Sequence, residues 1–245
     1  MIFFHRSVYL IDFLEGITDI HNHLLPGIDD GAPDLETTIN MIQAMKDIGV
    51  RNAIATPHTM EDYYQNDVAS ITANFQETTK ALEATAARGF IRNAASEYMM
   101  DGQWNQLIEE GAYLCLHKNY LLTELSYFQR PDPLETWVFK MCQKGLIPIL
   151  AHPERYAYLH SVNRLTDLKN RGFELQLNLL SLSDHYGEQV HAKAISLLDK
   201  GLYEYLGTDA HHLTHLEKIK NIKIKKKHLP SLKKLVEHHK QVFDL

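Results

Sequence analysis

The chain has 245 residues, of which 44% are hydrophobic and 23% are charged, a composition typical of an ordinary globular protein. Its net charge of −6 argues against a general nucleic-acid-binding protein, because such proteins are usually basic. No apolar run approaches the roughly 18 residues that cross a bilayer, and the opening stretch, MIFFHRSVYLIDFLEG, carries charges and lacks the cleavage site of a signal peptide.

Short apolar segments alternate with longer amphipathic ones along the chain. The short segments are rich in β-branched and apolar residues and predict strands at 16–21, 51–58, 90–98, 120–126, 146–153, 173–179 and 203–209. The longer segments each end at a glycine and predict helices at 34–49, 67–89, 133–145, 162–172 and 188–201. The last stretch, 216–245, is lysine-rich, and we expect it to be helical with a break at Pro230.

This alternation predicts the α/β class, with a mostly parallel sheet and helices outside it. A closed barrel and an open doubly wound sheet both fit the pattern. No G-x-G-x-x-G motif follows the first predicted strand, so a dinucleotide-binding fold has no support. The two cysteines, Cys115 and Cys142, are too few for a disulfide framework and favour a reducing compartment, so we expect a cytoplasmic protein.

Metal-capable side chains stand at the carboxyl end of nearly every predicted strand. Taken in chain order they are His21, His23, His58, Glu97, Glu124, His152, Asn178, Asp209 and His211. In a β/α barrel these ends converge on one mouth, which is where active sites lie. Any one of these residues could be a surface or capping residue, and Asp29 and Asp30 could simply form a turn. Glu124 and Asn178 could equally be satisfied polar groups, but the joint pattern indicates a site.

The residue types indicate the chemistry of that site. Histidine nitrogens and carboxylate oxygens suit zinc, manganese and iron, and partly magnesium. A catalytic zinc takes about three protein ligands, so this many candidates predicts two or three divalent ions. Clustered divalent ions are typical of phosphoester hydrolysis. Arg155 lies three residues after His152 and could bind a phosphate with two parallel hydrogen bonds; the alternative is a surface salt bridge with Glu154 or another acid.

Four motifs carry a family resemblance: DIHNHLLPGIDDGA (19–32), IATPH (54–58), AHPERY (151–156) and GTDAH (207–211). Together they resemble the PHP-domain (polymerase and histidinol phosphatase) phosphoesterases, and more closely the CpsB/YwqE-type bacterial tyrosine-protein phosphatases of capsule and exopolysaccharide systems. The resemblance implies a distorted seven-stranded (β/α)7 barrel that forms a single domain over residues 1–245. Residues 1–16 would be an N-terminal extension, and residues 217–245 a lysine-rich C-terminal helical segment.

The resemblance also implies a trinuclear metal centre, with manganese expected first and iron, zinc or magnesium as alternatives. One ion would be held by His21, His23, Glu97 and Asp209. Glu97 would bridge to a second ion, which His152 also binds. A third would be held by Asp30, His58 and His211, and Glu124 aligns loosely with a ligand position in some relatives. Arg155 would bind the substrate phosphate, so the catalytic residues expected are Arg155, His152 and Asp209.

The substrate implied is phosphotyrosine in a protein, namely the tail of a bacterial tyrosine kinase. Two alternatives remain: a phosphatase of a small metabolite such as histidinol phosphate, and a non-catalytic scaffold that docks a kinase. A cysteine-dependent phosphatase is excluded, because it needs an arginine six residues after the cysteine, where this chain has Leu121 and Pro148.

Two further segments prompt weaker hypotheses. The lysine-rich stretch from Lys218 to Lys234 could attract an acidic partner or an anionic membrane surface, so peripheral membrane association is possible; a solvated helix face is the alternative. Tyr63 and Tyr64, just past His58, could stack on a phosphotyrosine ring.

Overall fold

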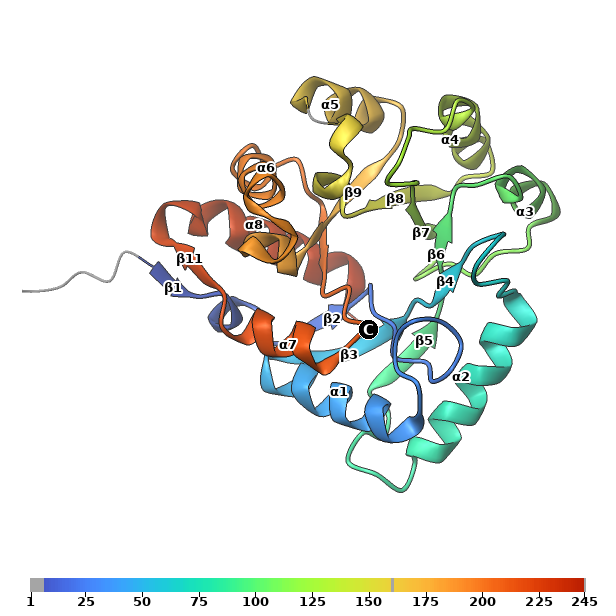
Figure 1. The fold of residues 1–245 in the computed structure, drawn as a ribbon, viewed down its shortest axis with the longest axis vertical. Helices are drawn as coiled ribbons and strands as arrows, with labels where there is room; N and C mark the ends of the chain where they lie inside the picture. The colour runs from blue at the N-terminus through green and yellow to red at the C-terminus, as the bar shows by residue number, and fades with distance from the viewer. Residues whose placement is uncertain (1–6, 160, 245) are drawn as a thin grey trace, which may run out of the picture.

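The computed structural model describes residues 7–159 and 161–244, in which a curled set of parallel strands is surrounded by helices (Figure 1). The strands are β1 (Ser7–Tyr9), β2 (Ile17–Asp19), β3 (Val50–Ala55), β4 (His58–Thr59), β5 (Ile91–Ala94), β6 (Glu97–Met99), β7 (Tyr120–Glu124), β8 (Ile147–Ala151), β9 (Glu174–Asn178), β10 (Tyr205–Gly207) and β11 (Lys223–Lys225). The α-helices are α1 (Leu35–Asp47), α2 (Val68–Leu82), α3 (Trp104–Glu110), α4 (Leu134–Gln143), α5 (Val162–Asn170), α6 (Glu188–Asp199), α7 (Leu213–Lys220) and α8 (Leu229–Phe243).

The parallel strands fall into two sheets. A six-stranded sheet has the order β10-β9-β8-β7-β6-β4, and a three-stranded sheet has the order β2-β3-β5. A single parallel bridge between Asn22 and Ala210 links the segment after β2 to the segment after β10. The predicted α/β class with a parallel sheet is confirmed, and its sheet is curled as in a half-barrel.

The strands are less regular than the seven uninterrupted segments that we expected. The predicted strand at 51–58 is divided into β3 and β4 around Pro57, which has no N–H to donate to a ladder. The predicted strand at 90–98 is divided into β5 and β6. The pairing register also shifts between Ile17 and Thr18 and between Ala53 and Ile54, and such irregularities bend a sheet.

Both faces of the central strands are buried, which explains their continuous apolar sequences. Leu121 and Leu150 point to the helices and pack into the larger core. Their neighbours Leu122 and Ile149 point the other way, into a second cluster enclosed by the curled strands. Phe243 of α8 packs into that second cluster, so the last helix closes one end of it.

The two ends of the chain depart most from expectation. Within the N-terminal extension, residues 1–6 lie outside the described residues, while residues 7–9 form β1, which pairs antiparallel with β11. We expected helix where β11 lies and a break at Pro230, but Pro230 stands in the first turn of α8, where a missing N–H costs nothing. Helix α3 was also not expected from the sequence.

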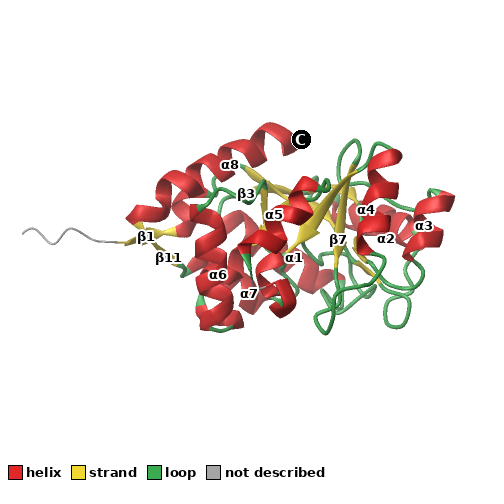
Figure 2. Cartoon of the chain, turned by 90° about the horizontal axis from the view of Figure 1, so that it is seen from above, coloured by secondary structure: helices red, strands yellow, loops and turns green. Residues whose placement is uncertain are grey.

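The β1–β11 ribbon and the carboxyl ends of the parallel strands occupy different places in this fold. The β1–β11 ribbon lies at the far end of the molecule from α3 (Figures 1 and 2). The carboxyl ends of the parallel strands carry the polar residues of the four motifs. In the part of the chain that is described, no helix is both long and apolar enough to cross a membrane.

Candidate metal centre

The structure brings the predicted metal ligands together at the carboxyl ends of the parallel strands. Potential ligand atoms of three overlapping groups lie within 4.8 Å of one another in each group. The groups are His21, His23, Glu97 and Asp209; His23, Asp30, His58 and His211; and His58, Glu97 and Glu124. His152 joins them through its Nε2 atom, which lies 2.9 Å from Oε1 of Glu97.

The first group is the most deeply buried. The Nε2 atom of His21 lies 3.1 Å from Oε2 of Glu97 and 3.3 Å from Oδ1 of Asp209. The Nε2 atom of His23 lies 3.6 Å and 3.5 Å from the same two oxygens. None of these four side chains is more than 2% exposed. They therefore enclose one small space from four sides.

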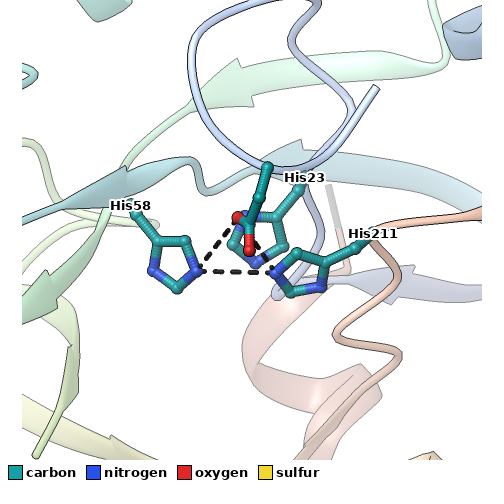
Figure 3. Close-up of side chains that lie close together, drawn as sticks. His23, His58 and His211 are labelled. Carbon is teal, nitrogen blue, oxygen red and sulfur yellow. Dashed lines mark hydrogen bonds and ion pairs between the residues drawn. The ribbon is translucent and has the colours of Figure 1, made fainter. Parts of the chain in front are cut away.

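The second group opens toward solvent. Figure 3 shows the rings of His23, His58 and His211 turned toward one another, although the three residues come from distant segments. The Nε2 atoms of His58 and His211 are 3.4 Å apart, and Oδ1 of Asp30 lies 3.6 Å and 3.5 Å from them. The side chain of Asp30 is 52% exposed, so this group forms the solvent side of the site.

The third group includes a residue whose role the sequence left open. Glu124, at the end of β7, is buried, and its Oε1 atom lies 3.0 Å from Nδ1 of His58. Its other oxygen lies 4.0 Å from Nε2 of His152. Glu124 therefore lies inside the cluster and could hold an ion together with Glu97.

Three of the histidines are oriented by hydrogen bonds on the side of the ring away from the cluster. Nδ1 of His21 lies 3.0 Å from Oε1 of Gln176, Nδ1 of His23 lies 2.7 Å from Oδ2 of Asp29, and Nδ1 of His211 lies 3.0 Å from the carbonyl oxygen of Asp209. An acceptor at Nδ1 places the proton there and leaves Nε2 with a free lone pair. Metal-binding histidines are held in this way by an outer partner.

Two of these orienting residues were not predicted as part of the site. Asp29 also accepts hydrogen bonds from the backbone N–H groups of Gly31 and His58, so it ties the loop after β2 to β4. Gln176 is a fully buried amide in the apolar strand β9. A polar residue inside such an apolar strand is a sequence signal from which Gln176 could have been predicted as part of the site. Asn178, a candidate from its place at a strand end, donates from Nδ2 to Oδ2 of Asp209 at 2.7 Å.

Several buried polar atoms of the cluster have no hydrogen-bond partner. They are Nε2 of His21, Nε2 of His23, Nδ1 of His58, Oε2 of Glu97 and Oε1 of Glu124. They lie 3.0 to 3.6 Å from one another as imidazole and carboxylate pairs, without forming hydrogen bonds. All five face the shared spaces, and all are atoms that bind divalent cations. The donor set therefore fits a cluster of bound metal ions.

The electrostatics of the site favour positive charge beside its carboxylates, from protonated histidines or from bound cations. Burial alone would lower the pKa of His21, but the carboxylates of Glu97 and Asp209 outweigh it and raise the pKa to about 10. Burial would raise the pKa of Glu97 and Asp209, yet the neighbouring histidines hold both well below their usual range. Both carboxylates thus stay ionised in a buried place and require positive charge beside them.

Arg155 lies beside this cluster, between two tyrosine rings. It is carried by the short 3-10 turn Pro153–Arg155, directly after β8. Its guanidinium carbon lies 4.7 Å from the ring centre of Tyr127 and 4.2 Å from that of Tyr186. Its NH1 group donates to Oδ2 of Asp209 at 3.0 Å, so a salt bridge with an acid does form, and its partner is Asp209. Tyr127 and Tyr186 were not predicted.

The two tyrosines after His58 differ in position. Tyr64 stacks on the ring of His58, with ring centres 5.5 Å apart and an angle of 13° between the planes. Tyr63 is 80% exposed. Only Tyr64 therefore contacts the cluster.

Comparisons with known proteins are consistent with this geometry. The family model described as capsular polysaccharide synthesis, CpsB/CapC, matches residues 17–235. The tyrosine-protein phosphatase YwqE of Bacillus subtilis is 30% identical over 197 residues, which cover 80% of this chain and 77% of that protein. The putative tyrosine-protein phosphatase CapC of Staphylococcus aureus is 26% identical over 201 residues, which cover 81% and 78%.

A solved structure is also similar over most of its length. It comes from work on YwqE from Bacillus subtilis and CpsB from Streptococcus pneumoniae, described as unique metal-dependent tyrosine phosphatases. It matches this chain with a TM-score of 0.79 and 26% identity, and the match covers 93% of this chain and 94% of the other.

Proposed function

This chain belongs to the CpsB/CapC family of capsular polysaccharide synthesis, and we propose that it is a metal-dependent protein-tyrosine phosphatase. The observation that carries the proposal is the set of buried histidine and carboxylate atoms that form no hydrogen bond, gathered beside Arg155. Together they provide a site for cations and a site for phosphate side by side. The relatives named as tyrosine-protein phosphatases supply the substrate class.

In the proposed site, two or three divalent ions occupy the shared spaces, with manganese preferred over iron, zinc or magnesium. The ligand distances support the following assignment. His21, His23, Glu97 and Asp209 hold the first ion. Glu97 and His152 hold the second, to which we add Glu124. Asp30, His58 and His211 hold the third.

The ions would supply activation of water and neutralisation of charge on the phosphoryl group. The side chains of the chain have other tasks. Arg155 binds the phosphoryl oxygens with the N–H groups that Asp209 does not use, and Tyr127 and Tyr186 hold its guanidinium plane in one orientation. Asp29 and Gln176 keep the histidine rings turned toward the site.

The leaving group explains why phosphotyrosine suits such a site. A tyrosine hydroxyl has an unperturbed pKa of about 10, far below that of an alkyl alcohol. It can depart as a phenolate with little help from a general acid. We therefore propose that aryl phosphates are better substrates than phosphoserine.

The physiological substrate that we propose is a phosphotyrosine protein, namely the tail of a bacterial tyrosine kinase. The two alternatives are less well supported. A small-metabolite phosphatase has no counterpart among the named relatives above. A non-catalytic scaffold would be expected to lack ligands, whereas all eight predicted ligand residues are gathered in the cluster.

We further propose that the two parallel sheets form one distorted seven-stranded (β/α)7 ring within a single domain over residues 1–245. The ring would count β3 with β4 and β5 with β6, and the bridge from Asn22 to Ala210 supports its closure. Pairing of β1 with β11 supports including the N-terminal extension and the C-terminal segment in the same domain. The free thiols Cys115 and Cys142 support a cytoplasmic location.

The decisive experiment compares two treatments of the enzyme acting on a phosphotyrosine peptide. Chelation should abolish hydrolysis and added divalent metal should restore it, whereas alkylation of Cys115 and Cys142 should leave the rate nearly unchanged. His152→Ala should lower bound metal and activity together. The control is His191→Ala, which removes a histidine paired with Asp184 and should change neither bound metal nor activity. Activity that survives chelation but is lost on thiol modification would contradict the proposal.

A further inference from the structure

Arg155 is carried by a turn that is too short to hold a long side chain in place by itself. The turn comprises three residues, Pro153–Arg155, between the end of β8 and Tyr156. Hydrogen bonds within a 3-10 turn have poor geometry, so a single turn of this kind is weakly held by its own bonds. Its orientation therefore depends on side chains that reach it, or extend from it, to other elements.

Lys193, in the middle of α6, bonds to the backbone on both sides of Arg155. Its Nζ atom donates to the carbonyl oxygen of Pro153 at 2.9 Å and to that of Tyr156 at 3.0 Å. One ammonium group thus ties the backbone before and after the residue that we propose to bind phosphate. Burial lowers the pKa of Lys193 to about 8 and the charge of Glu154 opposes this effect, so the side chain is a cation at neutral pH.

Glu154 ties the same turn to β9 and to the segment before β10. Its carboxylate is buried. Oε1 accepts a hydrogen bond from the backbone N–H of Asn178 at 3.1 Å, and Oε2 accepts one from the Tyr203 hydroxyl at 2.9 Å. Both oxygens are therefore engaged away from Arg155, although the two residues are neighbours in the sequence.

The contacts of Glu154 lead back to the guanidinium through Asn178. Nδ2 of Asn178 donates to Oδ2 of Asp209 at 2.7 Å, and NH1 of Arg155 donates to the same oxygen at 3.0 Å. The hydroxyl of Tyr186, whose ring lies against Arg155, accepts from the same Nδ2 at 3.3 Å. Glu154 holds the backbone of Asn178, and the side chain of Asn178 orders two of the groups that contact the guanidinium.

We propose that Lys193 and Glu154 are positioning residues for Arg155, which fix its turn so that the guanidinium meets the phosphoryl oxygens in one orientation. This role rests on the proposed function, in which Arg155 binds the phosphoryl group. Both residues act through backbone groups of the turn and of Asn178. Their effect on phosphate can be large, because a misplacement of 1 Å far from the chemistry can cost about a hundredfold in rate.

The space around Lys193 allows this role to be tested without loss of the fold. A cavity of about 400 Å³ beside the turn is lined by Glu154, Tyr156 and Lys193 and by apolar residues such as Val190 and Leu197. When the ammonium is removed, water in this cavity can bond to the two carbonyl oxygens in its place. The turn then loses its tie to α6, while its carbonyl groups keep a partner.

Lys193→Met removes the ammonium and keeps most of the length of the side chain. The dissociation constant of inorganic phosphate for the metal-loaded protein, measured by calorimetry, should rise roughly tenfold, or about 1.4 kcal/mol. Bound metal should stay at the wild-type level. The matched control is Lys46→Met, because Lys46 is also half-buried and donates to a backbone carbonyl, that of Ala86, but lies in α1. This control should bind phosphate like the wild type.

A double-mutant cycle with Arg155 separates positioning from a general effect on the site. In the wild-type background, Lys193→Met should lower kcat/KM for p-nitrophenyl phosphate roughly tenfold. In an Arg155→Ala background the same change should cost less than about twofold, because both changes act on one group. Fully additive losses, or wild-type phosphate binding by Lys193→Met, would overturn the proposal.

The contribution of Glu154 has its own pair of variants. Tyr203→Phe removes the hydroxyl that donates to Glu154, whereas Tyr205→Phe removes a nearby hydroxyl that donates to Glu174 at 2.6 Å. Tyr203→Phe should raise the dissociation constant of phosphate at least about twofold, the lower end of what one net hydrogen bond contributes. Tyr205→Phe should not change it, and equal phosphate binding by the two variants would overturn the role of Glu154.

Phosphate binding and peptide hydrolysis distinguish failure of this inference from failure of the proposed function. A wild-type protein that binds phosphate, loses it in Lys193→Met and yet hydrolyses no phosphotyrosine peptide would contradict the proposed function and support the positioning role. A wild-type protein that hydrolyses the peptide, with Lys193→Met equal to it in phosphate affinity and in kcat/KM, would support the proposed function and overturn the positioning role.

Discussion

Arg155 shows how much of a residue's role depends on its surroundings rather than on its charge. Two aromatic faces and the Asp209 carboxylate fix the plane of its guanidinium. The remaining N–H groups are therefore held in fixed directions before a phosphate binds. A lysine at this position would keep the charge and lose the two-pronged geometry.

Arg155→Lys should therefore lower kcat/KM for a phosphotyrosine peptide by roughly 10- to 100-fold, since hydrogen bonds to charged groups contribute about 1.5–3 kcal/mol. The exposed control Arg88→Lys should leave kcat/KM unchanged. Steady-state kinetics of both variants is the measurement. A wild-type value for Arg155→Lys would show that a point charge suffices at this position.

The backbone conformation at His152 is a second feature that belongs to the residue scale. His152 has φ 36° and Asp209 has φ 51°, both in the left-handed region that is costly for residues with a Cβ. Each follows a buried strand and turns its side chain into the cluster. Strain of this kind is common at functional sites, where the surrounding structure imposes it.

Replacing His152 by Gly or by Ala should remove metal binding equally, but the two variants should differ in stability. In the metal-free state the Ala variant should be less stable by about 1 kcal/mol, because only Ala retains the left-handed penalty. At His191, within helix α6, the order should reverse, because Gly is the poorer helix residue by about 1 kcal/mol. Denaturant unfolding of the four variants checks both orders, and an Ala variant as stable as Gly at position 152 would show that no strain is stored there.

At the scale of elements, the loop after β2 links two of the proposed ligands, His23 and His58. Asp29 bonds to the ring of His23 and to the N–H of His58, so the loop closes over the site. Gly31 makes this possible, because a Cβ there would collide with the carbonyl oxygen and the Cβ of His23. The glycine of this motif is therefore required by close approach to a proposed ligand.

Gly31→Ala should displace His23 and lower both bound metal and activity while the secondary structure is kept. Gly102→Ala is the matched control, because a Cβ there would meet only the flexible end of Glu61. Metal analysis, circular dichroism and peptide hydrolysis are the measurements. A Gly31→Ala enzyme with normal metal content would mean that the loop shifts without moving His23.

At the scale of the whole molecule, the site and the fold are linked through protonation. In the absence of metal, neighbouring carboxylates raise the pKa of His21 and His23 to about 10 and that of His58 to about 9, against the opposing effect of burial. These groups stabilise the folded state fully below a pH of about 6.5, and their contribution is lost as pH rises through 9 to 10. Burial lowers the pKa of His211 and of His239 to about 4, so their contribution is present above a pH of about 6.5 and is lost as pH falls.

Metal-stripped protein should therefore be most stable near pH 6.5, with Tm falling on both sides. Bound metal replaces the histidine protons, so metal affinity should rise with pH and the loaded protein should keep its stability at pH 9. Thermal unfolding of stripped and loaded protein from pH 5 to pH 9 is the measurement. Parallel curves for the two forms would show that metal and protons do not compete for the same groups.

Much about this protein could be predicted from the sequence because it depends on local order along the chain. Alternating apolar segments predicted the α/β class and the position of most helices, and the four motifs predicted the family to which the chain belongs. Strand ends at one edge of a parallel sheet must lie close together, so most of the proposed ligands were found by their place in the pattern, whereas Asp30 was named from the family resemblance. None of these predictions required a distance between atoms.

The tertiary structure decided everything that depends on contacts between distant segments. It placed Glu124 within reach of His58, turned Asp29 and Gln176 to hold the histidine rings, and set Arg155 between Tyr127 and Tyr186. It also made a strand of the lysine-rich segment at 223–225, because pairing with β1 and burial of Ile224 outweigh its local preferences. Most of these contacts join residues well separated in the sequence, by 155 positions for His21 and Gln176. A linear pattern carries no information about which side chains they bring face to face.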